Sequence, residues 1–181
     1  MIGLAIMRMQ ILEPLMDYEP LVGSWLSAYQ DTRRRTLDTL GGLKPNLIDW
    51  YPPWSDNAVN AILYHLAAIE AEWLFTDILE KSEYPPLIDE LFPYDVHDAD
   101  GNLTSVPGIS LEAHIQRLTD MREYFMNTMR EINDRDFRRA RIFPDYRVTP
   151  EWVIYHLMQH EAEHRGQIMD LREAHEHRKT T

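Results

Sequence analysis

Apolar residues recur at steps of three and four along four long segments of the chain, a spacing that predicts four amphipathic helices. In the first segment, Val22, Leu26 and Tyr29 fall on one helical face. The stretches between the segments lack the strict alternation that predicts a half-buried strand. The predicted helices run from about Glu19 to Leu40, from Ser55 or Asp56 to about Glu80, from Ser110 to about Ile132, and from Thr149 to about His175.

Residues at the borders of these segments favour helix ends. Gly41 and Gly42, followed by Pro45, end the first predicted helix. Thr149 is a good N-cap, and Pro150 suits the first helical position after it. The borders therefore have support that is independent of the apolar pattern.

The connections between the helices complete the fold prediction. Those at 43–54 and 133–148 are rich in Pro, Asp and aromatic residues, and that at 82–109 is the longest. A connection of that length is usually functional or disordered. Four helices with one long connection, between the second and the third, indicate an all-α four-helix bundle. We expect a single domain over residues 1–181, with an N-terminal segment at 1–18.

Composition narrows the classes of function. The chain is 44% hydrophobic and 27% charged, as in an ordinary globular protein. Its net charge of −12 argues against nucleic-acid binding, because phosphate contacts require a basic face. No stretch approaches the roughly 18 apolar residues of a membrane span, and the apolar run at 1–7 lacks the flanking pattern of an export signal. We therefore expect a cytoplasmic protein without nucleic-acid or membrane partners.

The chain contains no cysteine and eight histidines. The absence of cysteine excludes disulfides, thiolate-ligated zinc, iron–sulfur clusters and a cysteine nucleophile. Histidines remain as the candidates for metal or acid–base chemistry, so their positions decide what the chain can do.

Three histidines are predicted to face the interior together. His160 and His164 lie four residues apart, so they project from one helical face and can chelate one divalent ion. His65 lies beside the apolar stripe of the second helix and is also expected to point inward. The three would form a neutral site with one or more open coordination positions. The alternative, three hydrogen-bonded core histidines, needs a separate buried partner for each ring. The stripe that the chelating pair continues consists of Val153, Leu157, Ile168 and Leu171.

The other five histidines are weaker candidates. His156 is the rival ligand, one turn before the chelating pair, but at about 100° per residue it lies toward the edge of the stripe. We expect His97 and His114 to be loop and surface residues, and His175 and His177 to lie in a charged tail.

Residues 160–164 read His-Glu-Ala-Glu-His, which has the spacing of the zinc-protease motif whose glutamate is the general base. The glycine and the third histidine that follow this motif in one protease class are absent at their expected offsets. Glu161 is therefore interpreted as a neighbour of the metal site or as a solvated residue.

Two segments of the chain are similar in sequence. Residues 64–73 and 155–164 share Tyr, His, Leu, Glu, Ala and Glu at equivalent positions, so that His65 corresponds to His156. Two explanations of this similarity stay open: a duplicated helical hairpin, and chance similarity between two amphipathic helices. The other two helices show no comparable match, so duplication has no further support.

Several of these features resemble one known family. Trp54 and Ser55 precede the helix that carries His65, and residues 160–167 carry His-x-x-x-His followed by Arg-Gly-Gln. Together they resemble the DinB-like (YfiT-like) superfamily of bacterial metal-dependent four-helix proteins, over nearly the whole chain. The resemblance implies that His65, His160 and His164 bind zinc, nickel or another divalent ion. It also implies an up-down-down-up bundle that is frequently dimeric, and apolar faces on the first and third helices permit a homodimer.

The resemblance also implies a chemistry. Characterised relatives include S-transferases and isomerases that use low-molecular-weight thiols, which favours a metal-dependent transferase acting on a small electrophilic substrate. Glu161 or Gln167 would then orient the ligands or the incoming group, while Arg165 would assist an acidic substrate or simply be exposed. Two other functions stay open: a metal-dependent hydrolase that activates water, and a metal-binding stress-response protein without turnover.

Overall fold

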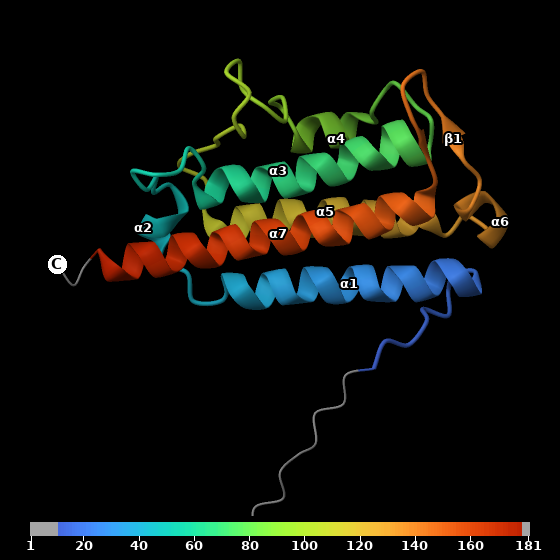
Figure 1. The fold of residues 1–181 in the computed structure, drawn as a ribbon, viewed down its shortest axis with the longest axis horizontal. Coiled ribbons are helices and arrows are strands. Elements are labelled where there is room, and N and C mark those ends of the chain that lie inside the picture. The colour runs from blue at the N-terminus through green and yellow to red at the C-terminus, as the bar shows by residue number, and fades with distance from the viewer. Residues whose placement is uncertain (1–10, 179–181) are drawn as a thin grey trace, which may run out of the picture.

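The computed structural model describes residues 11–178, and these are predominantly helical. The expected all-α class is confirmed. Residues 1–10, which make up much of the expected N-terminal segment, lie outside the described residues, as do 179–181. Four long helices lie side by side (Figure 1): α1 at Pro20–Leu40, α3 at Val59–Glu72, α5 at Leu111–Met129 and α7 at Pro150–His177.

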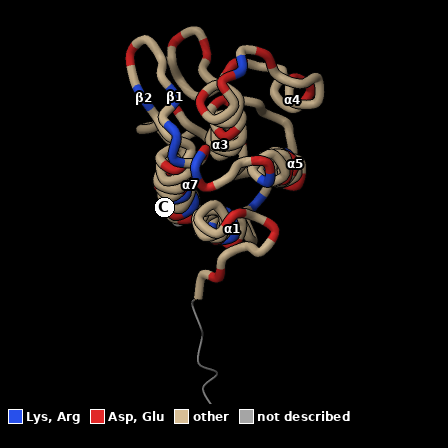
Figure 2. Tube along the Cα trace, turned by 90° about the vertical axis from the view of Figure 1, so that its right-hand side faces the viewer, with Lys and Arg blue, Asp and Glu red and all other residues tan. Residues whose placement is uncertain are grey.

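The long helices run in two opposite directions. The colour gradient shows that α1 and α7 run one way and α3 and α5 the other (Figure 1). Viewed end-on, the four helices occupy four corners around a shared interior (Figure 2). The most extensive helix contacts join α1 to α7 and α3 to α5. None of the helices in residues 11–178 combines the length and the apolar character that a membrane crossing requires.

Two of the predicted helix starts are confirmed by N-cap hydrogen bonds. The backbone N–H of Ala113 donates to the Ser110 hydroxyl at 3.2 Å, and that of Trp152 donates to the Thr149 hydroxyl at 3.1 Å. These side chains satisfy N–H groups that the first helical turn leaves without a partner. Beyond the end of α1, Gly42 has a φ of +74°, which glycine adopts without strain.

The second predicted helix begins later than predicted and changes its helix type before its end. It begins at Val59, because the Ser55 hydroxyl accepts a hydrogen bond from the Asn57 N–H and so closes a local turn instead of capping a helix. At its far end, α3 continues into a π-helix, η1, at Trp73–Ile78. Wider turns of this kind often occur at functional sites. The prediction of a helix from 55 or 56 is therefore wrong by three or four residues.

The long connection at 82–109 is fastened to α3. The Tyr64 hydroxyl donates to the carbonyl oxygen of Tyr94 at 2.6 Å and accepts from the Tyr94 N–H. The Asn60 side-chain oxygen accepts from the N–H of Val106. Both anchoring residues of α3 are fully buried, so they hold the connection against one side of the helices.

Shorter elements fill the other connections. The prediction that 133–148 contains no strand is wrong, since two strands pair there in antiparallel orientation. Each strand has only two residues, too few for alternation to be visible in the sequence. The short elements are α2 at Pro45–Ile48, α4 at Pro86–Leu91, α6 at Asp134–Phe137, β1 at Arg141–Ile142 and β2 at Arg147–Val148.

Candidate metal centre

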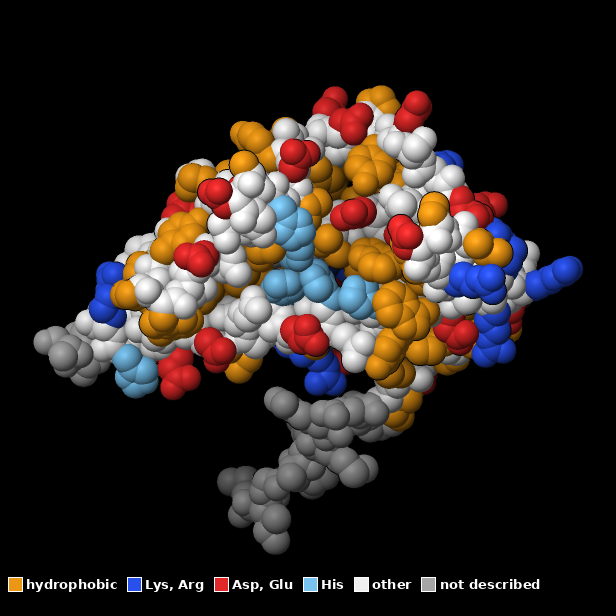
Figure 3. All heavy atoms as spheres, turned by 45° about the horizontal axis from the view of Figure 1, so that its top comes forward, with side chains coloured by type: hydrophobic (Ala, Val, Ile, Leu, Met, Phe, Trp, Pro, Cys, Tyr) orange, Lys and Arg blue, Asp and Glu red, His pale blue; other side chains and the backbone are white. Residues whose placement is uncertain are grey.

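Three imidazole rings converge where α3 faces α7. His65 projects from α3, and His160 and His164 project from successive turns of α7. The Nε2 atom of His160 lies 3.0 Å from that of His65 and 3.1 Å from that of His164. Figure 3 shows histidine side chains gathered in the middle of one face, beside a hydrophobic patch. The structure thus brings together the three residues that the sequence identified as candidate ligands.

Local sequence explains why these rings meet. The spacing of four residues places His160 and His164 on one face of α7. His65 is 5% exposed and lies on the part of α3 that packs against α7, while the other two rings are half-buried. One side of the cluster therefore remains accessible to a small molecule.

All three rings are held in the neutral form. Burial, together with the neighbouring rings of His160 and His164, lowers the pKa of His65 to about 3. Burial and the adjacent His164 ring lower the pKa of His160 to about 4. Burial also lowers the pKa of His164, although its hydrogen bond to Gln167 opposes that shift. Neutral imidazoles are the form that binds metals.

Hydrogen bonding leaves a lone pair directed into the cluster. Nδ1 of His164 lies 2.9 Å from Oε1 of Gln167. Because that oxygen can only accept, Nδ1 carries the ring proton and Nε2 keeps its lone pair. Gln167 therefore orients this ring as an outer partner orients a metal-binding histidine.

The donor set fits a divalent ion. Bonds of about 2.0–2.1 Å in tetrahedral geometry require nitrogen separations of about 3.3 Å. The two Nε2 separations of 3.0 and 3.1 Å are close to that value, and a nitrogen of each ring lies within 4.8 Å of the other two. On His65, Nδ1 is buried without a hydrogen-bond partner, so this nitrogen gains nothing from the interior to offset its burial.

His97 lies closer to this cluster than expected. The loop assignment is correct, since the residue is exposed on the 82–109 connection. Its ring centroid, however, lies 5.5 Å from that of His65. Only the fastening of the connection to α3 produces this approach, and local sequence carries no sign of it.

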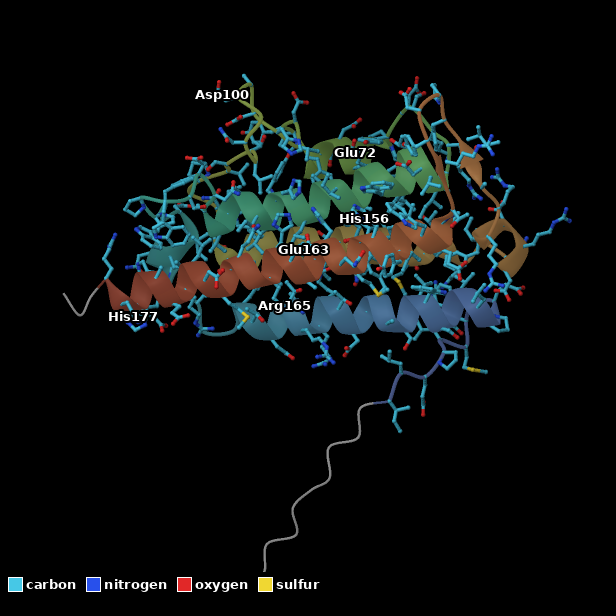
Figure 4. All side chains as sticks on the ribbon, in the orientation of Figure 1. Glu72, Asp100, His156, Glu163, Arg165 and His177 are labelled. Carbon is cyan, nitrogen blue, oxygen red and sulfur yellow. The ribbon has the colours of Figure 1, made fainter. Side chains whose placement is uncertain are left out.

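His156, the rival ligand, has other neighbours. Its ring stacks on Trp152 at 5.0 Å with an interplanar angle of 6°, and its centroid lies 5.0 Å from that of Trp73. It does not belong to the group of three converging nitrogens, although its ring centroid is 6.0 Å from that of His160. Figure 4 marks His156 on the side of α7 that faces α3.

Glu161 is part of a buried ionic cluster of four residues, Arg33, Glu70, Arg122 and Glu161, with one member on each long helix. Arg33 donates to Glu161 at 2.7 Å and to Glu70 at 2.8 Å. Arg122 donates to both carboxylates as well. Glu161 is 2% exposed, so the interpretation of a solvated side chain is wrong. Because two guanidinium groups hold its carboxylate, a role as a protease base finds no support here.

Sequence reasoning missed the other members of the ionic cluster. A sign of one was present, since Arg33 continues the stripe of Val22, Leu26 and Tyr29 on the first helix. A charged residue inside an apolar stripe indicates a buried partner of opposite charge. Which carboxylate supplies that partner depends on how the helices pack.

Three further expectations concern single residues. His114 is 1% exposed, because it lies one turn before Leu118 on the buried face of α5, so its surface assignment is wrong. His175 is also 1% exposed and packs edge-on against Trp50, so only His177 remains exposed in the predicted tail. Arg165 points from α7 toward α1, where its guanidinium reaches a backbone carbonyl at 3.5 Å (Figure 4).

Comparison with known proteins gives one match. A sequence model of the DinB superfamily matches residues 28–168, which include the three converging histidines and Gln167. No curated protein matches the chain.

Proposed function

Because the chain belongs to the DinB superfamily, we propose that it binds a divalent metal ion, zinc or nickel, through His65, His160 and His164. The observation that carries the proposal is the convergence of three neutral imidazoles, with nitrogen separations suited to one ion. Membership of the family also supports an up-down-down-up four-helix bundle as the scaffold. A homodimer is part of the same proposal.

We propose further that the protein is a metal-dependent transferase that joins a low-molecular-weight thiol to a small electrophile. A divalent ion among neutral imidazoles lowers the pKa of a coordinated thiol or water toward neutrality. The thiol must come from outside, because the chain has no cysteine. In an addition, sulfur forms the new bond to the electrophilic carbon, and the thiol proton ends on the substrate.

The chain's own residues would position this chemistry. Gln167 fixes the ring of His164 through its Nδ1 proton. Glu161, fixed by Arg33 and Arg122, holds the adjoining turn of α7 in place and is a positioning residue in this scheme. The bundle excludes water from the His65 side of the cluster, while half-buried His160 and His164 leave the other side open.

Metal analysis tests the ligands. Purified protein should carry near-stoichiometric metal, and His65→Ala, His160→Ala and His164→Ala should each lose it. His177→Ala is the matched control, since that residue is exposed on the same helix as two of the ligands. Full occupancy in His164→Ala together with loss in His156→Ala would mean that the ligand assignment is wrong.

A conjugation assay tests the reaction. Consumption of a small electrophile should require both the metal and an added thiol. Turnover with metal but without thiol would instead indicate a hydrolase. Stabilisation by metal with no turnover across a substrate panel would favour a non-catalytic metal-binding protein.

A further inference from the structure

A cleft lined by aromatic side chains lies at the start of α7, the helix that carries His160 and His164. It has a volume of about 570 Å³ and is formed by the π-helix η1, the β1–β2 hairpin and the first turn of α7. Small-molecule sites typically enclose about 300–1,000 Å³. Its main walls are Trp73, Tyr146, Val148 and Trp152.

The aromatic rings form a continuous surface. The centroids of Trp73 and Trp152 lie 5.7 Å apart, and the ring of His156 contacts both at 5.0 Å. Trp152 remains 46% exposed and Tyr146 45% exposed, so large apolar faces remain open to solvent. Ring faces arranged in this way suit a planar molecule, since aromatic pairs gain energy beyond simple burial.

The same surface leads to the metal centre. His156 contacts the two tryptophans on one side, and its ring centroid is 6.0 Å from that of His160. The imidazole of His156 therefore lies between the two tryptophans and a candidate ligand.

One positively charged side chain lines the cleft. Arg147 is the one charged side chain among the described residues that line it. The neighbouring arginines of this segment are already paired: Arg138 with Glu151, Arg139 with Glu80, and Arg141 with Asp136. Across residues 11–178, Arg147 is exposed and makes no ion pair. An exposed guanidinium beside aromatic faces is suited to a carboxylate carried on a flat ring.

We infer that this cleft binds the planar, apolar part of a small organic anion, with Arg147 pairing its carboxylate. The inference rests on the proposed function and names its substrate class: an aromatic or conjugated carboxylate. Trp73 and Trp152 hold the ring, and His156, which contacts both tryptophans, lies between them and His160.

The test uses metal-free protein, so that its outcome does not depend on metal binding or turnover. With 5-fluorotryptophan labelling, 2-naphthoate should shift the fluorine resonances of Trp73 and Trp152 and leave that of Trp54 unchanged. Trp54 is a suitable internal control, because it is 63% exposed and lies outside this cleft. Binding of the neutral analogue 2-naphthamide measures the contribution of ring contacts to affinity without that of the carboxylate charge.

Two variants decide the outcome. Arg147→Gln should weaken 2-naphthoate binding about tenfold and leave 2-naphthamide within about twofold, as expected for loss of a charge-assisted contact. Trp152→Ala should weaken both probes at least about tenfold. Arg138→Gln, which alters an exposed arginine of the same segment outside the cleft, should change neither.

Equal binding of both probes to wild type and Arg147→Gln would overturn the inference, as would a shift confined to Trp54. Dissociation of a dimer in Trp152→Ala would also overturn it, by making the cleft a contact between copies of the chain. Metal content and thiol conjugation are measured separately, so failure of the proposed function leaves this test intact.

Discussion

One turn of α7 contributes to two polar clusters that differ in kind. His160 and His164 direct their rings toward His65, whereas Glu161 directs its carboxylate into the interior, toward Arg33 and Arg122. Both clusters lie among the same four helices. Their comparison distinguishes polar groups that balance one another's charges and hydrogen bonds from polar groups that need a ligand to do so.

The ionic cluster is complete in itself. Two arginines and two glutamates balance in charge, and each carboxylate accepts from both guanidinium groups. Arg122 also lies over the ring of Tyr29 at 3.5 Å. Buried charges are tolerated when their partners are fixed in this way, and removal of one member leaves an uncompensated charge.

The histidine cluster is incomplete by comparison. Its rings are neutral, their nitrogens face each other, and Nδ1 of His65 has no hydrogen-bond partner. Since no counter-charge is built in, a cation can enter without breaking an ion pair. We conclude that the ionic cluster fixes the relative positions of the helices and that the histidine cluster is the part able to take a ligand.

The largest effect is expected from the ionic cluster. Glu161→Ala should lower the free energy of unfolding of the metal-free protein by about 3–5 kcal/mol, because two buried guanidinium groups lose a carboxylate. Urea denaturation measures the change. Glu163→Ala, at an exposed position two residues along the same helix (Figure 4), should change stability by less than about 0.5 kcal/mol. Similar losses of stability in the two variants would contradict the structural role of the ionic cluster.

The histidine cluster should respond to metal instead. At a metal concentration about 100-fold above the dissociation constant, wild-type protein should gain about 2.7 kcal/mol of stability, and His160→Ala should gain almost none. Melting curves with and without metal give the comparison. An undiminished gain in His160→Ala would place the metal elsewhere.

A smaller effect is expected at the residue that orients a ligand. Gln167→Ala should weaken metal binding about tenfold or more, as loss of an outer hydrogen-bond partner does. Competition with a chelator measures it. Since Gln167 is exposed, the metal-free stability should stay close to that of wild type. Unchanged affinity would show that the hydrogen bond to His164 has no part in metal binding.

The last effect concerns pH and separates the clusters by titration window. In metal-free protein the pKa values of His65 and His160 are about 3 and about 4, below the ordinary value of about 6.5 in the unfolded chain. Between pH 6.5 and about 4 the unfolded chain therefore binds more protons, so stability is full above pH 6.5 and falls on acidification.

Glu161 should titrate in a different window. Burial raises its pKa, but Arg33 and Arg122 lower it by more, so its contribution is lost only below the ordinary glutamate pKa of about 4.3. Between pH 7 and 5, in the presence of chelator, His160→Ala should lose less stability than wild type. Denaturation midpoints across that range provide the measurement, and identical slopes would contradict it.

Sequence alone determined much of this protein. Apolar spacing placed the four long helices, and Ser110 and Thr149 marked two of their starts, because caps and helical faces depend on residues a few positions apart. The same locality identified His160 and His164 as a pair. It failed at Ser55, whose hydroxyl forms a turn, and at the two-residue strands of the hairpin, which are too short for a pattern.

Tertiary structure decided which polar groups meet. The partners of Glu161 lie on two other helices, His97 approaches His65 only because Tyr64 and Asn60 fasten its connection, and Arg147 reaches the aromatic cleft through the hairpin. Each of these contacts depends on the rotation and register of packed elements. Those variables are set by the whole core, so no local stretch of sequence encodes them.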